Sequence, residues 1–249
     1  MLSSKKSSAK VPTTSTPSFN PSGGKSSLVD SSDRVADAAD QNQYLKAAIE
    51  GSLEFKWVDI PSAPGWQVTS DAVKLDGVRF PVTAHTAQQI ADVLSAYLTT
   101  PLLEDLIETD AEIKVVSPTQ DFRIMHTQKA VDAFNKGINE QLKGSSFGTL
   151  VSCVGKSWVL TKELESKPLG TACNYGMFRP DGPYLSITRK YKLWQQPGYR
   201  HDIHHWDYSQ VLRLCRPKIP TSGDYGIRVI PSHDGVELGR HPWIEEIKK

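Results

Sequence analysis

The order of its local sequence patterns is the strongest constraint on the fold of this chain. Residues 84–143 carry helical periodicity, whereas from residue 147 onward strand-like apolar runs are separated by Gly, Pro, Asp and Ser turns. Helices and strands that are segregated in this way favour an α+β fold, because a doubly wound α/β fold alternates them along the chain. We therefore expect an α+β fold with a helical N-terminal half packed on a mainly antiparallel β C-terminal half.

The first 34 residues differ in composition from the rest of the 249-residue chain. Ser, Thr, Pro, Lys and Gly dominate them, so they cannot bury enough apolar surface to offset the entropy lost on ordering. We expect a disordered tail over residues 1–34 and one α+β domain over 35–249, which is helix-rich over 35–146 and strand-rich over 147–249. The chain contains no run of about 18 apolar residues, which predicts no membrane span.

Three local signals place elements in the helix-rich half. Asp76-Gly77 between apolar runs predicts a β-hairpin. Thr86, followed by Gln89 three residues later, predicts a capping box for a helix whose apolar face extends to Leu98. Thr100-Pro101 predicts the next helix start, with threonine as N-cap and proline as the first helical residue.

Charge and cysteine usage restrict the class of partner. With 29 Lys and Arg against 28 Asp and Glu, the net charge is +1, which gives no reason to expect nucleic acid. Cys153, Cys173 and Cys215 lack metal-knuckle spacing. Three interpretations of these cysteines stay open: buried thiols, one disulfide with one thiol left over, or a nucleophilic cysteine. No standard signal peptide is visible, so a cytoplasmic location is the default and non-classical export the alternative.

The segment from Arg200 to Ser209 is the best candidate for a chemical site, because it holds three of the seven histidines and two aspartates. Imidazole and carboxylate are the usual zinc ligands and also the usual general acids and bases. If the residues after 203 form a strand, His205, Asp207 and Ser209 share a face. We expect His201, His205 and Asp207 to bind zinc, or His205 and Asp207 to transfer protons. A solvated loop or a structural histidine is the alternative.

Four further side chains are candidates for the same site. Tyr175 and Tyr208 are candidate catalytic residues that could donate a hydrogen bond to a developing oxyanion. Lys156 and Arg213 are candidate substrate-binding residues for a carboxylate, although arginines at strand ends are usually solvated or ion-paired. Lys156 does not belong to a phosphate loop, because Leu150 stands where that motif requires glycine.

These residues resemble a group of uncharacterised, mostly bacterial proteins. The helical pattern IADVLSAYLTTPLLEDLIE, the later run NYGMF and the run DYSQVLRL correspond to the group's "IAD-LG", "YGWH" and "DYSHG-RL" motifs. The resemblance covers roughly residues 53–216 and implies a shared architecture without a known activity. Two of the group's histidines are replaced here, by Phe178 and Gln210. A fainter similarity links the group to the SHGC-R motif of L,D-transpeptidases, but Leu212 stands in place of its cysteine.

Together these features predict a hydrolase with a His/Asp site, metal-dependent if zinc binds, that acts on peptidoglycan or a peptide. The rival interpretation is a non-catalytic binding or structural module, associated with phage or secretion, in which Trp66, Trp194 and Trp206 form a binding face. A third interpretation is a degenerate enzyme that has lost its activity. A catalytic site requires His205 and Asp207 to converge with another polar group in a pocket, whereas a binding module requires only an aromatic surface.

Overall fold

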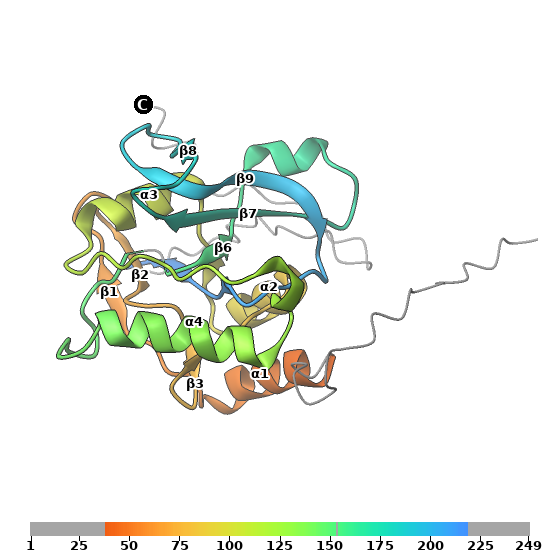
Figure 1. The fold of residues 1–249 in the computed structure, drawn as a ribbon. Helices are drawn as coiled ribbons and strands as arrows, with labels where there is room; N and C mark the ends of the chain where they lie inside the picture. Colours follow the sequence, from red (N-terminus) through yellow and green to blue (C-terminus); the bar gives the residue numbers. More distant parts are fainter. Residues whose placement is uncertain (1–37, 153, 219–249) are drawn as a thin grey trace, which may run out of the picture. The chain divides into compact units, whose positions relative to one another are not determined.

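The structure, a computed structural model, describes residues 38–152 and 154–218. The tail expected over residues 1–34, Cys153, and residues 219–249 of the part expected to be strand-rich lie outside the described residues. The described part confirms an α+β fold (Figure 1).

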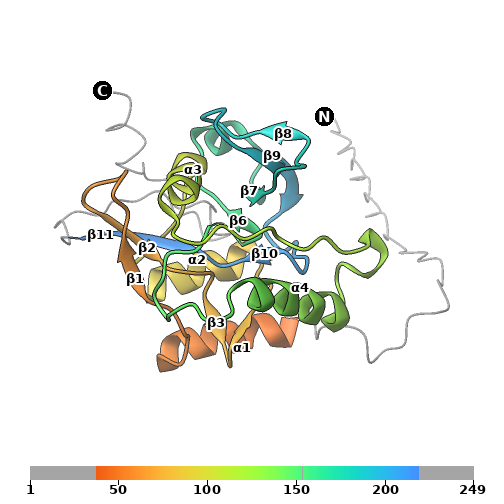
Figure 2. The ribbon, with the colours of Figure 1, turned by 60° about the vertical axis from the view of Figure 1, so that its left-hand side comes forward.

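The α-helices that the structure describes all come from the helix-rich half of the sequence. They are α1 (Ala38–Glu50), α2 (Ala84–Val93), α3 (Pro101–Asp110) and α4 (Gln128–Gln141), with short 3-10 helices at Phe122–Ile124 and Lys162–Ser166. Thr100 caps α3 through its side chain, and Pro101 is the first helical residue, as predicted. In Figures 1 and 2, α3 lies beside the end of the molecule that holds β7 and β9, whereas α1 and α4 lie farther from it.

The strands that the structure describes form three sheets. The first has the order β1-β2-β11-β5 and the second the order β10-β6-β7-β9-β8, while β3 and β4 form the hairpin predicted at Asp76-Gly77. Their bounds are β1 (Trp57–Asp59), β2 (Trp66–Thr69), β3 (Lys74–Leu75), β4 (Val78–Arg79), β5 (Tyr97–Leu98), β6 (Lys156–Trp158), β7 (Thr171–Phe178), β8 (Tyr184–Leu185), β9 (Lys192–Asp202), β10 (Gln210–Val211) and β11 (Leu214–Pro217).

The two halves of the chain share a sheet instead of forming separate layers. β11, from the strand-rich half, lies between β2 and β5, both from the helix-rich half, and pairs antiparallel with each. The larger apolar core likewise joins both halves; Trp158 of β6 is buried in it, and its indole N–H donates to the Val82 carbonyl oxygen at 2.7 Å. The expected segregation therefore holds for the helices but not for the strands.

Two predictions about α2 are wrong. Its N-cap is Thr83, which accepts a hydrogen bond from the Thr86 N–H, so the helix begins three residues earlier than the capping-box pattern indicated. The helix ends at Val93, because Ser95 adopts a positive φ of 49°. Tyr97 and Leu98 then form β5 and pair with Cys215 and Leu214.

Candidate active site

A close approach of two backbone segments brings Lys156 to the histidine segment. Gly155 has a φ of +125°, and a Cβ at this position would lie 2.5 Å from the Ser209 carbonyl oxygen, so a larger residue cannot stand here without a shift. The Lys156 N–H donates to that carbonyl at 2.7 Å, and β6 then pairs in parallel with β10, with Lys156 opposite Gln210.

The Asp207 carboxylate is buried and fully bonded. Lys156 Nζ lies 2.5 Å from Oδ2, and the Ser209 hydroxyl and N–H donate to Oδ1 at 2.6 and 2.9 Å. Burial raises the pKa of Asp207, but the interactions with His205, Lys156 and Ser209 outweigh it and hold the pKa well below its usual range. Asp207 is therefore an anion at neutral pH, paired with the Lys156 cation.

His205 and His201 stand beside this ion pair. His205 Nε2 lies 3.9 Å from Asp207 Oδ2, and the His205 side chain keeps 23% of its surface exposed. The His201 ring stacks on the His205 ring, with centroids 3.9 Å apart and planes 10° from parallel. Burial, with His205 and Lys156 nearby, lowers the pKa of His201 to about 4, so this imidazole is neutral at pH 7.

The stacking bears on the zinc prediction. A metal ion lies close to the plane of each imidazole that binds it, and two nearly parallel planes do not meet at such a point. The Asp207 carboxylate is, in addition, already paired with the Lys156 ammonium group. Within residues 38–152 and 154–218, no three His, Cys, Asp or Glu side chains are grouped to hold a metal. Zinc binding by His201, His205 and Asp207 stays a prediction, and it requires one ring to turn.

Three side chains of this region have buried polar atoms without a hydrogen-bonding partner in the described part of the chain. They are both side-chain polar atoms of Asn174, both of Gln210, and Nε2 of His205. Asn174 lies on β7 opposite Trp158, and Gln210 lies on β10 opposite Lys156; both are 0% exposed. Unpartnered buried polar atoms are rare and destabilising, so their concentration here indicates a place where a ligand or water completes the bonding.

A pocket of about 730 Å³ opens at this place. Asn174 and His201 both line it, so it joins one of the unpartnered amides to the stacked histidines. Its other lining residues come from β8, β9 and the loop before β8: Pro183, Tyr184, Trp194, Gln195, Gln196, Pro197, Gly198, Tyr199 and Arg200. Ligand sites are typically concave and combine apolar rings with a few placed polar groups, as here.

The two predicted tyrosines are engaged elsewhere. The Tyr175 hydroxyl donates to Asp105 Oδ1 of α3 at 2.6 Å and accepts from the Ile187 N–H. The Tyr208 hydroxyl accepts from the Gln120 N–H, and its ring packs on Phe134 in the smaller apolar core. Neither hydroxyl is shown at His205, so the oxyanion role expected for them has no support in this geometry.

Arg213 has a structural position. Its guanidinium is 1% exposed and donates to the backbone carbonyl oxygens of Thr69, Val151 and Ser152. A buried and bonded guanidinium cannot reach a substrate carboxylate. Lys156 is likewise occupied, by Asp207. Of the two predicted substrate-binding residues, Arg213 supports the backbone and Lys156 supports Asp207.

The histidine segment is not a strand throughout. His201 belongs to the end of β9, and the chain then turns, with the His205 N–H donating to the Asp202 carbonyl oxygen, before β10 begins at Gln210. The expectation of strand alternation after residue 203 is therefore wrong. Asp207 meets Lys156 because of this turn, not because of a shared strand face.

The two positions that depart from the resembling group have different environments. Phe178 is buried against Tyr175 and Tyr191. Gln210, by contrast, lies opposite Lys156, and both its side-chain polar atoms lack a partner among the described residues. Asn174 was not among the site residues predicted from the sequence. The structure shows the irregular register between β7 and β9 on both sides of Asn174, and it also places Asn174 in the pocket.

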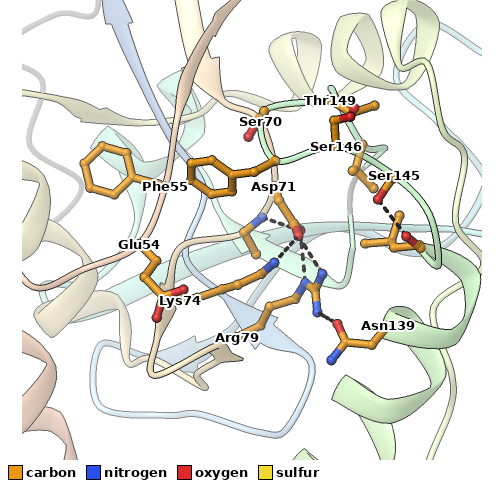
Figure 3. Close-up of a pocket in the computed structure, with 15 residues that line it drawn as sticks. Glu54, Phe55, Ser70, Asp71, Lys74, Arg79, Asn139, Ser145, Ser146 and Thr149 are labelled. Atoms are coloured by element: carbon orange, nitrogen blue, oxygen red, sulfur yellow. Dashed lines mark hydrogen bonds and ion pairs between the residues drawn. The ribbon is translucent and has the colours of Figure 1, made fainter.

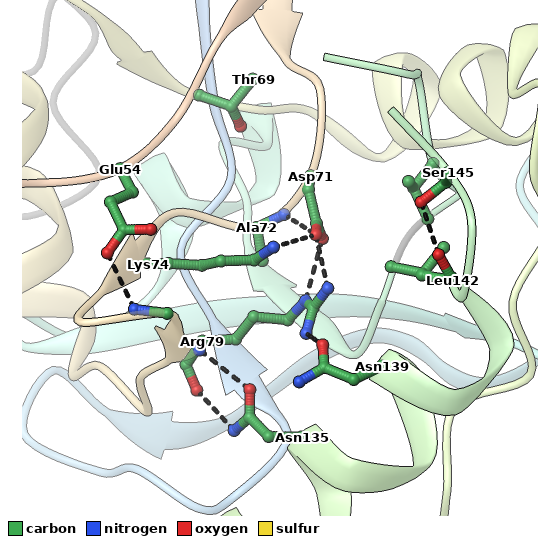
Figure 4. Close-up of polar contacts among 12 residues, drawn as sticks. Glu54, Thr69, Asp71, Ala72, Lys74, Arg79, Asn135, Asn139, Leu142 and Ser145 are labelled. Atoms are coloured by element: carbon green, nitrogen blue, oxygen red, sulfur yellow. Dashed lines mark hydrogen bonds and ion pairs between the residues drawn. The ribbon is translucent and has the colours of Figure 1, made fainter. Parts of the chain in front are cut away.

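A second polar pocket, of about 330 Å³, lies between the β3–β4 hairpin and the end of α4 (Figure 3). Arg79 and Lys74 both point at the carboxylate of Asp71, and Arg79 also donates to Asn139 at 2.7 Å. Figure 4 shows that Asn135 of α4 pairs with both backbone groups of Arg79. Charges of both signs are matched in this pocket, which therefore has the character of a structural network.

None of the helices in the described part of the chain combines the length and the apolar character that a bilayer crossing needs.

Comparison with known proteins finds no matching family model, no similar curated protein and no similar solved structure. The resemblance to the bacterial group therefore stays a prediction.

Proposed function

We propose that this chain is a hydrolase that cleaves an amide or ester bond in a polar polymer, with peptidoglycan or a peptide as the leading substrate. The observation that supports this is the convergence of His205, Asp207 and Lys156 beside a pocket that already holds an unpartnered buried amide. A catalytic site needs such a convergence, whereas a merely solvated histidine loop does not.

In the proposed reaction, His205 is the general base. Its Nε2 faces Asp207, which orients the ring and stabilises the imidazolium, so Nδ1 is the nitrogen that takes a proton from water. The water oxygen attacks the carbonyl carbon, and the proton passes from His205 to the leaving amine or alcohol as the carbonyl–heteroatom bond breaks. The 3.9 Å separation must shorten by about 1 Å for a hydrogen bond, as often happens when substrate binds.

His201 and Lys156 have supporting roles. Because the low pKa keeps His201 neutral, its remaining N–H can donate to the developing oxyanion without carrying a charge. Lys156 keeps Asp207 ionised and in place. Glycosidic cleavage fits less well, since it uses two free carboxyl groups, and here Asp207 is paired with Lys156 while Asp202 accepts from the His204 N–H.

The test is release of soluble fragments from labelled peptidoglycan and from labelled casein, with and without added zinc. We expect release by the wild type and a loss of at least about 100-fold in His205→Asn, the usual contribution of a general base. His204→Asn is the matched control, because His204 is exposed one residue away. Absence of release under all conditions, or undiminished activity in folded His205→Asn, would contradict the proposal.

A binding module is the second candidate, favoured by the exposure of Trp194, 46% of which is open to solvent. The three-tryptophan face expected for it is not formed, because Trp66 is only 8% exposed and stands in the apolar core. Retention of a polymer by the wild type without any turnover would favour this candidate over the hydrolase.

A further inference from the structure

The pocket between β7, β8 and β9 has a chemical character that restricts what it can hold. Of its lining residues, Arg200 alone is a permanent ion, and its side chain belongs to an exposed residue. Besides the His201 imidazole, the remaining polar side chains are amides and phenols: Asn174, Gln195, Gln196, Tyr184 and Tyr199. A largely neutral lining favours a neutral ligand over a polyanion or a polycation.

Asn174 is the most informative group in this pocket. Its carboxamide is 0% exposed and offers both an acceptor, Oδ1, and a donor, Nδ2, neither of which has a partner in the part of the chain that is described. A phosphate or carboxylate can satisfy only the donor, and an ammonium only the acceptor. A hydroxyl pair or an acetamido group satisfies both, because each contains a donor and an acceptor.

A glycine lies directly against the Asn174 amide. A Cβ on Gly198 would lie 2.7 Å from Asn174 Oδ1 and 2.6 Å from Gln195 Nε2, although the backbone at Gly198 is not in the left-handed region. The backbone conformation at position 198 therefore does not itself require a glycine. The glycine lets the Asn174 and Gln195 side chains lie against the Gly198 backbone, in a position from which any larger residue would displace them.

Aromatic rings provide the apolar part of the same pocket. Tyr184 and Trp194 are each 46% exposed, and Arg179 stacks over the Trp194 ring at 5.8 Å. Sugar rings present a face of C–H groups, which packs on aromatic rings, and a rim of hydroxyl or acetamido groups, which pairs with amides. Large exposed rings beside a buried carboxamide match both features.

We propose that this pocket is a saccharide subsite that takes a neutral sugar, with Asn174 pairing with its hydroxyl or acetamido groups. The inference rests on the proposed function in one respect. The glycan part of the polymer binds in this pocket and thereby positions the bond to be cleaved next to His201 and His205. The cleaved bond is then an amide or ester attached to a glycan.

The test is calorimetric titration of the full chain with a tetramer of N-acetylglucosamine, and separately with an alanine-rich pentapeptide. We expect the sugar to bind and the peptide not to bind. Gly198→Ala, whose Cβ would displace the Asn174 and Gln195 side chains, and Asn174→Ala, which removes the amide, should each weaken sugar binding at least 10-fold. Ser146→Ala, in the second pocket, is the control and should bind as the wild type does.

Binding and catalysis are separable in this design. Sugar binding that persists in His205→Asn supports the subsite whether or not the chain hydrolyses any bond. Failure of the wild type to bind the tetramer at millimolar concentration overturns the subsite, as does binding of the pentapeptide in place of the sugar. Unchanged affinity in folded Gly198→Ala and Asn174→Ala also overturns it. None of these three results decides whether His205 is a base.

Discussion

The two polar pockets of this molecule bury similar groups in opposite ways. In the pocket beside the β3–β4 hairpin, Arg79 is 0% exposed and its guanidinium is bonded to Asp71 and Asn139 (Figure 4). In the pocket beside β9, Asn174 is equally buried and its amide is bonded to nothing that the structure describes. The first arrangement stabilises the fold, and the second leaves hydrogen-bonding capacity unused.

The difference has an energetic meaning. A buried donor or acceptor without a partner costs about 1–3 kcal/mol, so a chain gains stability by pairing it or by replacing it with an apolar group. Among the described residues, five such atoms belong to Asn174, Gln210 and His205, which come from β7, β10 and the turn before β10. This concentration beside a pocket is expected where stability is given up for ligand binding or catalysis.

The largest predicted effect is in the bonded pocket. Asp71→Ala removes the carboxylate that pairs with Arg79 and Lys74, and leaves the Arg79 charge buried. We expect a loss of about 3–5 kcal/mol in the free energy of unfolding, measured by urea denaturation. Hydrolysis per folded molecule should not change. A loss below about 1 kcal/mol would show that the network is not structural.

The Lys156–Asp207 pair should behave similarly in stability but differently in activity. Lys156→Met leaves the Asp207 anion buried, at a cost of about 3 kcal/mol, whereas Lys156→Met combined with Asp207→Leu removes both charges and should recover most of that loss. Hydrolysis should be lost in the double variant, which has no Asp207 carboxylate to orient His205, and reduced in Lys156→Met, where Lys156 no longer holds that carboxylate in place. A double variant that is active would contradict the role of Asp207.

A smaller effect concerns pH. The pKa of His201 is about 4 in the folded chain and about 6.5 when unfolded, so between these values the unfolded state binds more protons. The burial of neutral His201 therefore costs no stability above pH 6.5. Below that pH it lowers the free energy of unfolding increasingly as the pH drops towards 4. His201→Asn should remove a destabilisation on the order of 1 kcal/mol at pH 5.

The check for that prediction is the free energy of unfolding of wild type and His201→Asn from pH 7.5 to 4.5. Glu108, whose pKa is raised to about 7 mainly by burial, lowers stability as the pH rises from about 4.5 to 7. It is present in both proteins, so it cancels in their difference. A difference that does not change with pH would exclude a buried neutral His201.

The smallest predicted effect has the opposite sign. Gln210→Met keeps the length of the side chain and removes two unpartnered polar atoms. Stability should stay level or rise by up to about 1 kcal/mol, measured by thermal and urea unfolding. A loss above about 2 kcal/mol would mean that the Gln210 amide is bonded within the fold.

What could be predicted from the sequence depended on short-range chemistry. Thr100-Pro101 predicted the start of α3, because an N-cap and a proline at the first helical position act locally. Asp76-Gly77 predicted the β3–β4 turn, and both residues have the positive φ that such a turn requires. His205 and Asp207 could be identified as candidates from residue type alone.

What could not be predicted depended on contacts between distant segments. β5 exists because Leu98 pairs with Leu214, and nothing near Leu98 indicates that partner. Lys156 was expected to bind substrate, but its partner is Asp207, 51 residues away. The bonding of Tyr175 to Asp105, and the lack of a partner for Asn174 among the described residues, are likewise tertiary features.

The most direct test compares the same substitution at two buried asparagines. Asn135 makes three hydrogen bonds, one from the Arg79 N–H and two to the Arg79 and Val131 carbonyl oxygens, whereas Asn174 makes none with the described residues. Urea unfolding of Asn135→Leu and Asn174→Leu should show a loss of about 3 kcal/mol for the first and a change of no more than about 1 kcal/mol for the second. If Asn174→Leu is destabilised as much as Asn135→Leu, the Asn174 amide is a bonded structural group, and the contrast between the two pockets fails.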